Sequence, residues 1–286
     1  MNAETRPFRL VVPGADLRGD IWIPDEIATD AAIVVCHGFK GFKDWGFFPY
    51  LTEQLALRTS LPAVCFSFEG SGVRERDFDD LTAFSTNTFT RELFDLEAVL
   101  DGLCVGRLGE TDVPAVTRFG LLGHSRGGAT VILKAATRRQ VEAVSTWAAI
   151  SSVDRYQAFR SAWDRGETPV IPNMRTGQDM PLERNVLDDM LANGPRLDVL
   201  AAAAALEVPT AIVHGDEDES VPFADAEALA GAAADFATLT KIEGGSHGFG
   251  AVHPFAGSNP GFERAIEASV EAFRKGLTRA DEERTT

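Results

Sequence analysis

The feature that most restricts the fold is a regular alternation of short apolar runs with helical stretches. Eight runs rich in Val, Ile and Phe recur along the chain, at Phe8–Val12, Ile21–Ile23, Ala31–Cys36, Ala63–Phe68, Phe119–Leu122, Val144–Ile150, Thr210–His214 and Thr238–Ile242. Several are apolar throughout, which is typical of strands buried on both faces of a sheet. Helical patterns separate most of them, at Tyr50–Leu57, Thr90–Leu103, Gly127–Thr137, Ala224–Ala234 and Phe262–Leu277. The alternation predicts an α/β fold with a mostly parallel eight-stranded sheet and helices on both faces.

Two departures from this alternation indicate how the chain is organised. The first two runs follow one another without a helix, which predicts an antiparallel hairpin at one edge of the sheet. Residues 151–206 separate two expected strands by more than a plain crossover needs, and they include a helical pattern near Val186–Leu191. Long excursions from compact domains are typically functional covers. We therefore expect a cap or lid at 151–206, inserted into a core domain made of residues 1–150 and 207–286.

Composition excludes several classes of function. The 43 acidic and 27 basic residues give a net charge of −16, which repels phosphate backbones and anionic lipid, so neither nucleic acid nor a membrane is an expected partner. No apolar run approaches the ~18 residues of a membrane span, and no secretory signal pattern opens the sequence, so we expect a cytoplasmic protein. The three cysteines are too scattered for a disulfide framework or a thiolate metal site. The charged end of the chain, Thr278 to Thr286, is expected to fray.

The strongest signal for chemistry is the G-x-S-x-G pattern at Gly123–Gly127, which places Ser125 between an expected strand and an expected helix. In that context the glycines allow a tight turn that holds the serine above the sheet, where its oxygen can attack. A second match surrounds Ser246, but the Gly- and Pro-broken loop after it cannot begin a helix. Ser125 is therefore the expected nucleophile.

A serine hydroxyl needs a base within hydrogen-bond reach and a carboxylate that orients this base. After a turn of this kind the acid comes first along the chain and the histidine second. The acidic loop after the seventh run offers Asp218 as the preferred acid, with Asp216 as the alternative. The glycine-bearing loop after the last run offers His247 as the preferred base, with His253 as the alternative. Neither H-E-x-x-H nor H-x-H spacing is present, so no metal is expected.

Acyl transfer also requires N–H groups aimed at the oxygen that becomes negatively charged. One expected donor is the N–H of Arg126, which follows the nucleophile at the start of a helix. The second is expected in the loop His37-Gly38-Phe39-Lys40-Gly41, after the third apolar run. The Phe39 N–H is the preferred donor there and the Lys40 N–H the alternative.

Aromatic residues that follow this loop predict the character of the substrate pocket. Phe47 and Phe48 are expected in the core, whereas Phe42 and Trp45, together with Trp163 from the cap, are expected to bind substrate. Such a wall favours an aromatic or medium-sized apolar acyl group over a highly charged one.

Taken together, these motifs resemble those of the α/β-hydrolases, in particular the dienelactone-hydrolase-like and cinnamoyl (feruloyl) esterase-like serine hydrolases. The resemblance covers about residues 30–140 and 207–277. It rests on His37-Gly38-Phe39, Phe66–Gly72, Gly123–Gly127, Gly215-x-x-Asp218-x-x-Val221-Pro222 and Gly245–Phe249. Position 125 is Ser where dienelactone hydrolases proper carry Cys, and position 67 is Ser where the family pattern has Asp.

The resemblance implies an α/β-hydrolase fold with an inserted cap and a Ser-His-Asp triad. We expect a serine hydrolase that cleaves a small carboxylic ester through an acyl-enzyme, without a cofactor, as a monomer or homodimer. Two alternatives stay open. The same triad could serve a thioesterase or an amidase or peptidase, or the chain could be a catalytically silent α/β-hydrolase that only binds its ligand.

Overall fold

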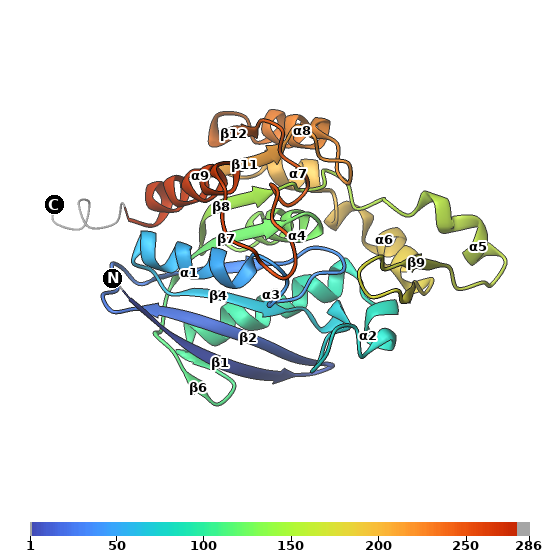
Figure 1. The fold of residues 1–286 in the computed structure, drawn as a ribbon, viewed down its shortest axis with the longest axis horizontal. Helices are drawn as coiled ribbons and strands as arrows, with labels where there is room; N and C mark the ends of the chain where they lie inside the picture. Colours follow the sequence, from blue (N-terminus) through green and yellow to red (C-terminus); the bar gives the residue numbers. More distant parts are fainter. Residues whose placement is uncertain (1, 279–286) are drawn as a thin grey trace.

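The computed structural model describes residues 2–278 and is built around a sheet of eight strands (Figure 1). The strands are β1 (Ala3–Val12), β2 (Ala15–Pro24), β3 (Ala31–Cys36), β4 (Ala63–Ser67), β7 (Arg118–His124), β8 (Val141–Trp147), β11 (Thr210–Gly215) and β12 (Ala237–Ile242). Their order in space is β1-β2-β4-β3-β7-β8-β11-β12. The pairs β1–β2 and β2–β4 are antiparallel and the remaining pairs are parallel. The predicted fold class and the edge hairpin are therefore confirmed, whereas the tail from 279 onward lies outside the described residues.

Helices cover both faces of this sheet because its central strands are apolar on both sides. In β3, Ile33 and Val35 pack on the side of α1 (Phe48–Thr59) and α9 (Pro260–Leu277). Ala32 and Val34 point to the opposite side, as expected for successive residues of a strand. That side carries α3 (Phe89–Cys104), α4 (Arg126–Ala135) and α8 (Phe223–Ala233). These five helices correspond to the five helical stretches in the sequence.

In helix α9 the local sequence determines both where the helix begins and which face packs on the sheet. The Asn259 side chain caps its first turn by accepting the Phe262 N–H at 3.0 Å, and Pro260 occupies the first helical position. Buried residues at 262, 266, 270 and 273 recur every three or four positions, so one apolar face packs on the sheet.

Between β8 and β11 the chain leaves the sheet and forms an insertion. It contains α5 (Arg160–Asp164), α6 (Asn185–Asn193) and a hairpin of β9 (Val170–Pro172) with β10 (Asp179–Pro181), and it ends in α7 (Val199–Ala204). In Figure 1 α5, α6 and β9 stand beyond one end of the sheet. Helix α6 lies where the sequence predicts one, and α7 packs against α4 and α8.

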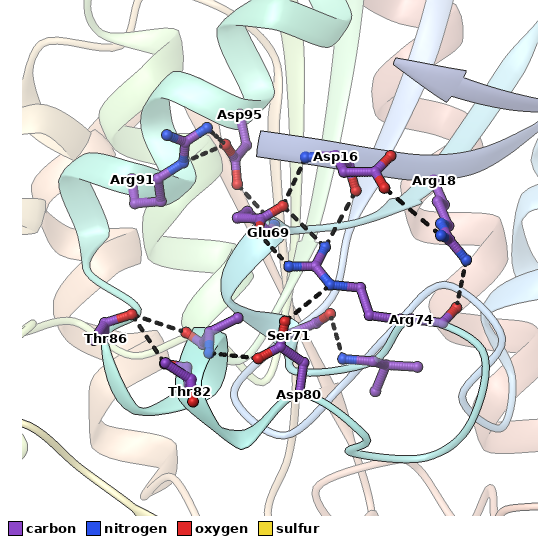
Figure 2. A network of polar contacts seen from close by, with 12 residues as sticks. Asp16, Arg18, Glu69, Ser71, Arg74, Asp80, Thr82, Thr86, Arg91 and Asp95 are labelled. Carbon is purple, nitrogen blue, oxygen red and sulfur yellow. Dashed lines mark hydrogen bonds and ion pairs between the residues drawn. The ribbon is translucent and has the colours of Figure 1, made fainter. Parts of the chain in front are cut away.

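A polar network fastens the segment after β4 to the edge hairpin and to α3 (Figure 2). The Glu69 carboxylate accepts the Asp16 N–H at 2.8 Å and also pairs with Arg74. The Glu69 N–H in turn donates to Asp95 at 2.9 Å, and Arg91 Nε donates to the same carboxylate at 2.7 Å. Burial outweighs these bonds and raises the pKa of Asp95 to about 6.

The remaining described elements are short. They are α2 (Leu81–Ser85) and the two-residue strands β5 (Arg107–Leu108) and β6 (Thr111–Asp112), together with single turns of 3₁₀ helix. Within residues 2–278, no helix is both long enough and apolar enough to cross a membrane.

Candidate active site

Ser125 occupies the sharp turn between β7 and α4, with φ 57° and ψ −120°. A non-glycine residue with such a positive φ is strained. The chain can turn this tightly because glycines flank it. A Cβ on Gly123 would lie 2.1 Å from the Gly127 carbonyl oxygen, and one on Gly127 would lie 2.4 Å from the His37 carbonyl oxygen. The structure thus places the expected nucleophile at the apex of a turn that no larger residues could form.

The preferred acid and base lie together in the loops after β11 and β12. His247 Nδ1 is 2.8 Å from Asp218 Oδ2, while Asp218 Oδ1 accepts the N–H groups of Ser220 and Val221 at 2.8 and 2.9 Å. The Asp218 side chain is fully buried and that of His247 is partly exposed. A hydrogen bond from Nδ1–H to the carboxylate leaves His247 Nε2 free to accept a proton. This is the arrangement that a general base requires.

A second histidine contacts the same carboxylate. His214, fully buried at the end of β11, places Nε2 3.2 Å from Asp218 Oδ2 and 2.9 Å from the Val221 carbonyl oxygen. Burial favours the neutral form of Asp218. Hydrogen bonds from His214, His247 and the Val221 N–H outweigh it and hold the pKa of Asp218 well below its usual range. Asp218 is therefore a carboxylate near neutral pH.

The loop after β3 lies directly against Ser125, because a Cβ on Gly38 would be 2.8 Å from the Ser125 Cβ. Within the described residues, the N–H groups of Phe39, Lys40 and Arg126 donate to no protein acceptor, so each is free to bind a substrate oxygen. The ring of His37 steadies this loop. Its Nε2 accepts the Phe68 N–H at 3.1 Å, and burial lowers its pKa to about 4, which keeps the ring neutral.

The alternative residues make other contacts. Asp216 is exposed, accepts the Gly244 N–H at 2.7 Å and pairs with Lys241. His253 Nδ1 accepts the Gly46 N–H at 2.7 Å, and its ring stacks on Trp45. Ser246 is exposed, and its hydroxyl oxygen accepts the Gly250 N–H at 3.1 Å. None of the three belongs to the cluster formed by Ser125, Asp218 and His247.

Two cavities adjoin Ser125 and His247, and Phe39 and Lys40 line both of them. The first, of about 340 Å³, is mainly apolar and is lined further by Phe89, Ile150, Val153, Phe159, Ile171 and Val221, among others. The second, of about 320 Å³, is also mainly apolar and includes Trp45, Asn173, Met174 and Arg175.

The three aromatic residues expected to bind substrate therefore have different surroundings. Trp45 lines the second cavity, but Phe42 and Trp163 line neither. Phe42 is buried and packs edge-on against Phe78, with the ring centres 6.2 Å apart. Trp163 is buried within the insertion, where its indole N–H donates to the Leu182 carbonyl oxygen at 3.0 Å.

A buried charge network beside Ser125 was not predicted. The Arg126 guanidinium donates to Glu92 Oε1 at 2.7 Å and to the Tyr156 hydroxyl at 2.5 Å, and it lies over the Phe89 ring. The neighbour of Tyr156, Arg155, reaches the loop of the acid, where it donates to the Ser220 carbonyl oxygen at 2.9 Å. Two consecutive residues of the insertion thus contact the turn of the nucleophile and the loop of the acid.

A sequence signal for Glu92 exists, since it stands on the apolar stripe of α3 with Phe89, Leu96 and Val99. A lone acid at such a position indicates a buried partner. Tyr156 offers no comparable signal, because it meets Arg126 only through the fold.

Comparison with known proteins agrees with this architecture. Among solved structures, the chain is similar to Est1E from Butyrivibrio proteoclasticus with ferulic acid bound. The two sequences are 20% identical, the match covers 95% of this chain and 99% of that chain, and the TM-score is 0.69. A dienelactone hydrolase from Anabaena variabilis shares 17% identity over 97% of this chain and 100% of that chain, with a TM-score of 0.64. An acylaminoacyl peptidase from Pyrococcus horikoshii shares 20% identity over 99% of this chain but only 43% of its own, with a TM-score of 0.68. At such identities the likeness shows the fold alone.

A search of curated proteins found no match to the sequence. A family model described as "Alpha/beta hydrolase family" matches residues 33–258, which is most of the chain and includes Ser125, Asp218 and His247. This match confirms the resemblance found in the motifs. The chain belongs to the alpha/beta hydrolase family.

Proposed function

We propose that the protein is a serine hydrolase that cleaves a small carboxylic ester. The observation that carries the proposal is the hydrogen bond between His247 and the buried Asp218 carboxylate, beside a serine held at the apex of a strained turn. A serine becomes a nucleophile only with such a base close by, and the base needs such a carboxylate.

In the first half of the reaction Ser125 Oγ attacks the ester carbonyl carbon while His247 Nε2 takes the hydroxyl proton. The carbonyl oxygen becomes an oxyanion, which accepts hydrogen bonds from the Arg126 N–H and from the Phe39 N–H or its neighbour. Collapse of this intermediate breaks the bond to the leaving oxygen, and His247 returns the proton to it. The acyl group is then bound to Ser125 as an ester, and the alcohol leaves.

In the second half a water molecule replaces the alcohol. His247 takes a proton from the water as its oxygen attacks the acyl carbon, and the proton returns to Ser125 Oγ when the acid is released. Asp218 stays ionised throughout, because its hydrogen bonds hold its pKa far below neutrality. It keeps the imidazole in one orientation and one tautomer and stabilises the imidazolium.

Labelling with a fluorophosphonate probe tests the nucleophile without assuming a substrate. We expect one adduct, located on Ser125 by peptide mapping, which disappears in Ser125→Ala and persists in Ser246→Ala. The second variant is a matched control because Ser246 lies in the other G-x-S-x-G pattern. An adduct on Ser246, or none on the folded wild-type protein, would contradict the proposal.

The class of bond is tested with butyryl compounds that share one acyl group. We expect the 4-nitrophenyl ester to be cleaved faster than the matched thioester and the matched anilide, and only when Ser125 is present. A faster thioester or anilide would assign the same triad to a thioesterase or amidase. Binding of all three without turnover would identify a silent member of the family.

A further inference from the structure

The charged residues that line the two cavities are of one sign. Apart from His247 and His124, the ionisable side chains on their walls are Lys40, Arg126, Arg155 and Arg175, together with the buried hydroxyl of Tyr156. No Asp or Glu lines either cavity, although the chain has 43 acidic residues against 27 basic ones. The side chains that line the space beside Ser125 therefore include cations but no carboxylate.

Carboxylates close to three of these cations already neutralise them. Arg126 pairs with Glu92 at 2.7 Å, Arg155 with Asp225 at 3.2 Å, and Arg175 with Asp77. None of these three carboxylates lines either cavity. The three arginines therefore add little net charge to the space that a substrate would occupy.

Lys40 differs from the arginines because no carboxylate of the described residues forms an ion pair with it. Its Nζ donates one hydrogen bond, to the Pro172 carbonyl oxygen of β9 at 3.3 Å. An ammonium has three donors, so two remain for a ligand. Burial lowers the pKa of Lys40, as expected for a partly desolvated cation that lacks a counter-ion.

The backbone at Lys40 is also unusual. Its φ is 58°, a conformation that disfavours any residue with a Cβ and that glycine adopts without strain. The loop therefore carries a lysine at a strained position, one residue from the preferred oxyanion donor and on the wall of both cavities.

We propose that the physiological ester carries a carboxylate, which binds in the second cavity against the Lys40 ammonium, while its uncharged part occupies the first cavity. This inference rests on the proposed function and names the substrate class of the same site. A single negative charge matches the single unpaired cation, and the Asn173 side of the cavity supplies further polar surface. The charge would hold the ester in register with Ser125.

Matched pairs of esters test the inference and tell on which side of the scissile bond the carboxylate lies. On the acyl side, mono-4-nitrophenyl esters of glutaric, adipic and pimelic acid are compared with 4-nitrophenyl pentanoate, hexanoate and heptanoate. On the leaving-group side, 3-carboxyphenyl hexanoate is compared with 3-carbamoylphenyl hexanoate. We expect wild-type kcat/KM to be at least tenfold higher for the anionic member in one of the two sets.

Variants then assign the preference to the ammonium. Lys40→Met keeps the length of the side chain and removes its charge, and we expect the anionic-to-neutral ratio to fall at least tenfold. Lys40→Arg keeps a cation and should retain more of the ratio. Lys275→Met removes the same charge from an exposed position of α9, outside both cavities, and should leave the ratio unchanged.

The outcomes separate this inference from the proposed function. Hydrolysis of neutral esters by Ser125 with no anionic preference in either set would overturn the inference and leave the proposed function intact. Equal ratios in wild type and Lys40→Met would also overturn it. Should no ester be hydrolysed, calorimetric binding to Ser125→Ala still decides, because the inference requires the adipate half-ester to bind more tightly than the hexanoate ester.

Discussion

The buried pair of Glu92 and Arg126 makes a quantitative prediction about stability. Both side chains are only 4% exposed, and Glu92 also accepts the Asn87 amide N–H at 2.8 Å and the Thr130 hydroxyl at 2.9 Å. Glu92→Leu leaves the guanidinium without a counter-ion, and breaking a buried ion pair in this way costs about 3–5 kcal/mol. The Asn87 amide loses its acceptor, which adds about 1 kcal/mol.

The free energy of unfolding should therefore fall by about 4–6 kcal/mol, a large share of the 5–15 kcal/mol typical of a folded protein. An unfolding entropy of about 2.1 cal/mol/K per residue gives roughly 0.6 kcal/mol/K for 286 residues. The melting temperature should accordingly drop by about 7–10 °C. Denaturant titration and calorimetry measure the two quantities.

Glu97 supplies a matched control on the same helix. It pairs with Lys134 of α4 and with Arg138 just beyond that helix, and its side chain is 39% exposed whereas theirs are 10% and 11% exposed. A pair with one half-exposed partner contributes less than a fully buried pair, and Arg138 keeps Asp101 as a partner, so Glu97→Leu should cost clearly less than Glu92→Leu. The double variant Glu92→Leu/Arg126→Met should be more stable than Glu92→Leu alone, since it also removes the buried guanidinium that would otherwise lack a counter-ion. Equal losses for Glu92→Leu and Glu97→Leu would refute the reasoning.

Two further predictions concern histidines beside the triad. His214→Leu should lower kcat roughly tenfold, less than the ~10⁴ that follows when the acid itself is neutralised, with a smaller effect on KM because His214 contacts Asp218 and the Val221 carbonyl oxygen and lines neither cavity. His214→Gln, which keeps an N–H donor at similar reach, should retain more activity, and equal loss in both variants would count against a positioning role. Burial lowers the pKa of His124 to about 3, so the unfolded chain takes up this proton first as the pH falls, and stability is lost between about pH 6.5 and 3. His124→Gln should reduce that loss in denaturant titrations at pH 7 and pH 4, and an unchanged loss would show that other groups cause it.

Much of the fold could be predicted because its buried strands carry an unbroken apolar signal. The ends of the strands and helices were predicted less accurately. The run Val144–Ile150 predicts a strand that continues to Ile150, whereas β8 begins at Val141 and ends at Trp147. The next residue, Ala148, has a φ of 49°, and an apolar alanine gives no sequence signal for such a turn.

The residues of the candidate site could be predicted where a local sequence motif indicates the role of a residue. Ser125, Asp218 and His247 each stand in a loop directly after a strand, and a parallel sheet brings such loops to one edge. The pocket walls have no such pattern. Phe42 and Trp163 were expected at the site because they are aromatic, but whether a loop residue faces a cavity or the core depends on contacts that arise only in the folded chain.

The strained turn at Ser125 places catalysis and folding in opposition at one position. A residue held at φ 57° costs about 1–3 kcal/mol, and glycine would relieve most of that strain. Ser125→Gly should therefore stabilise the protein while it removes the hydroxyl that the proposed reaction requires.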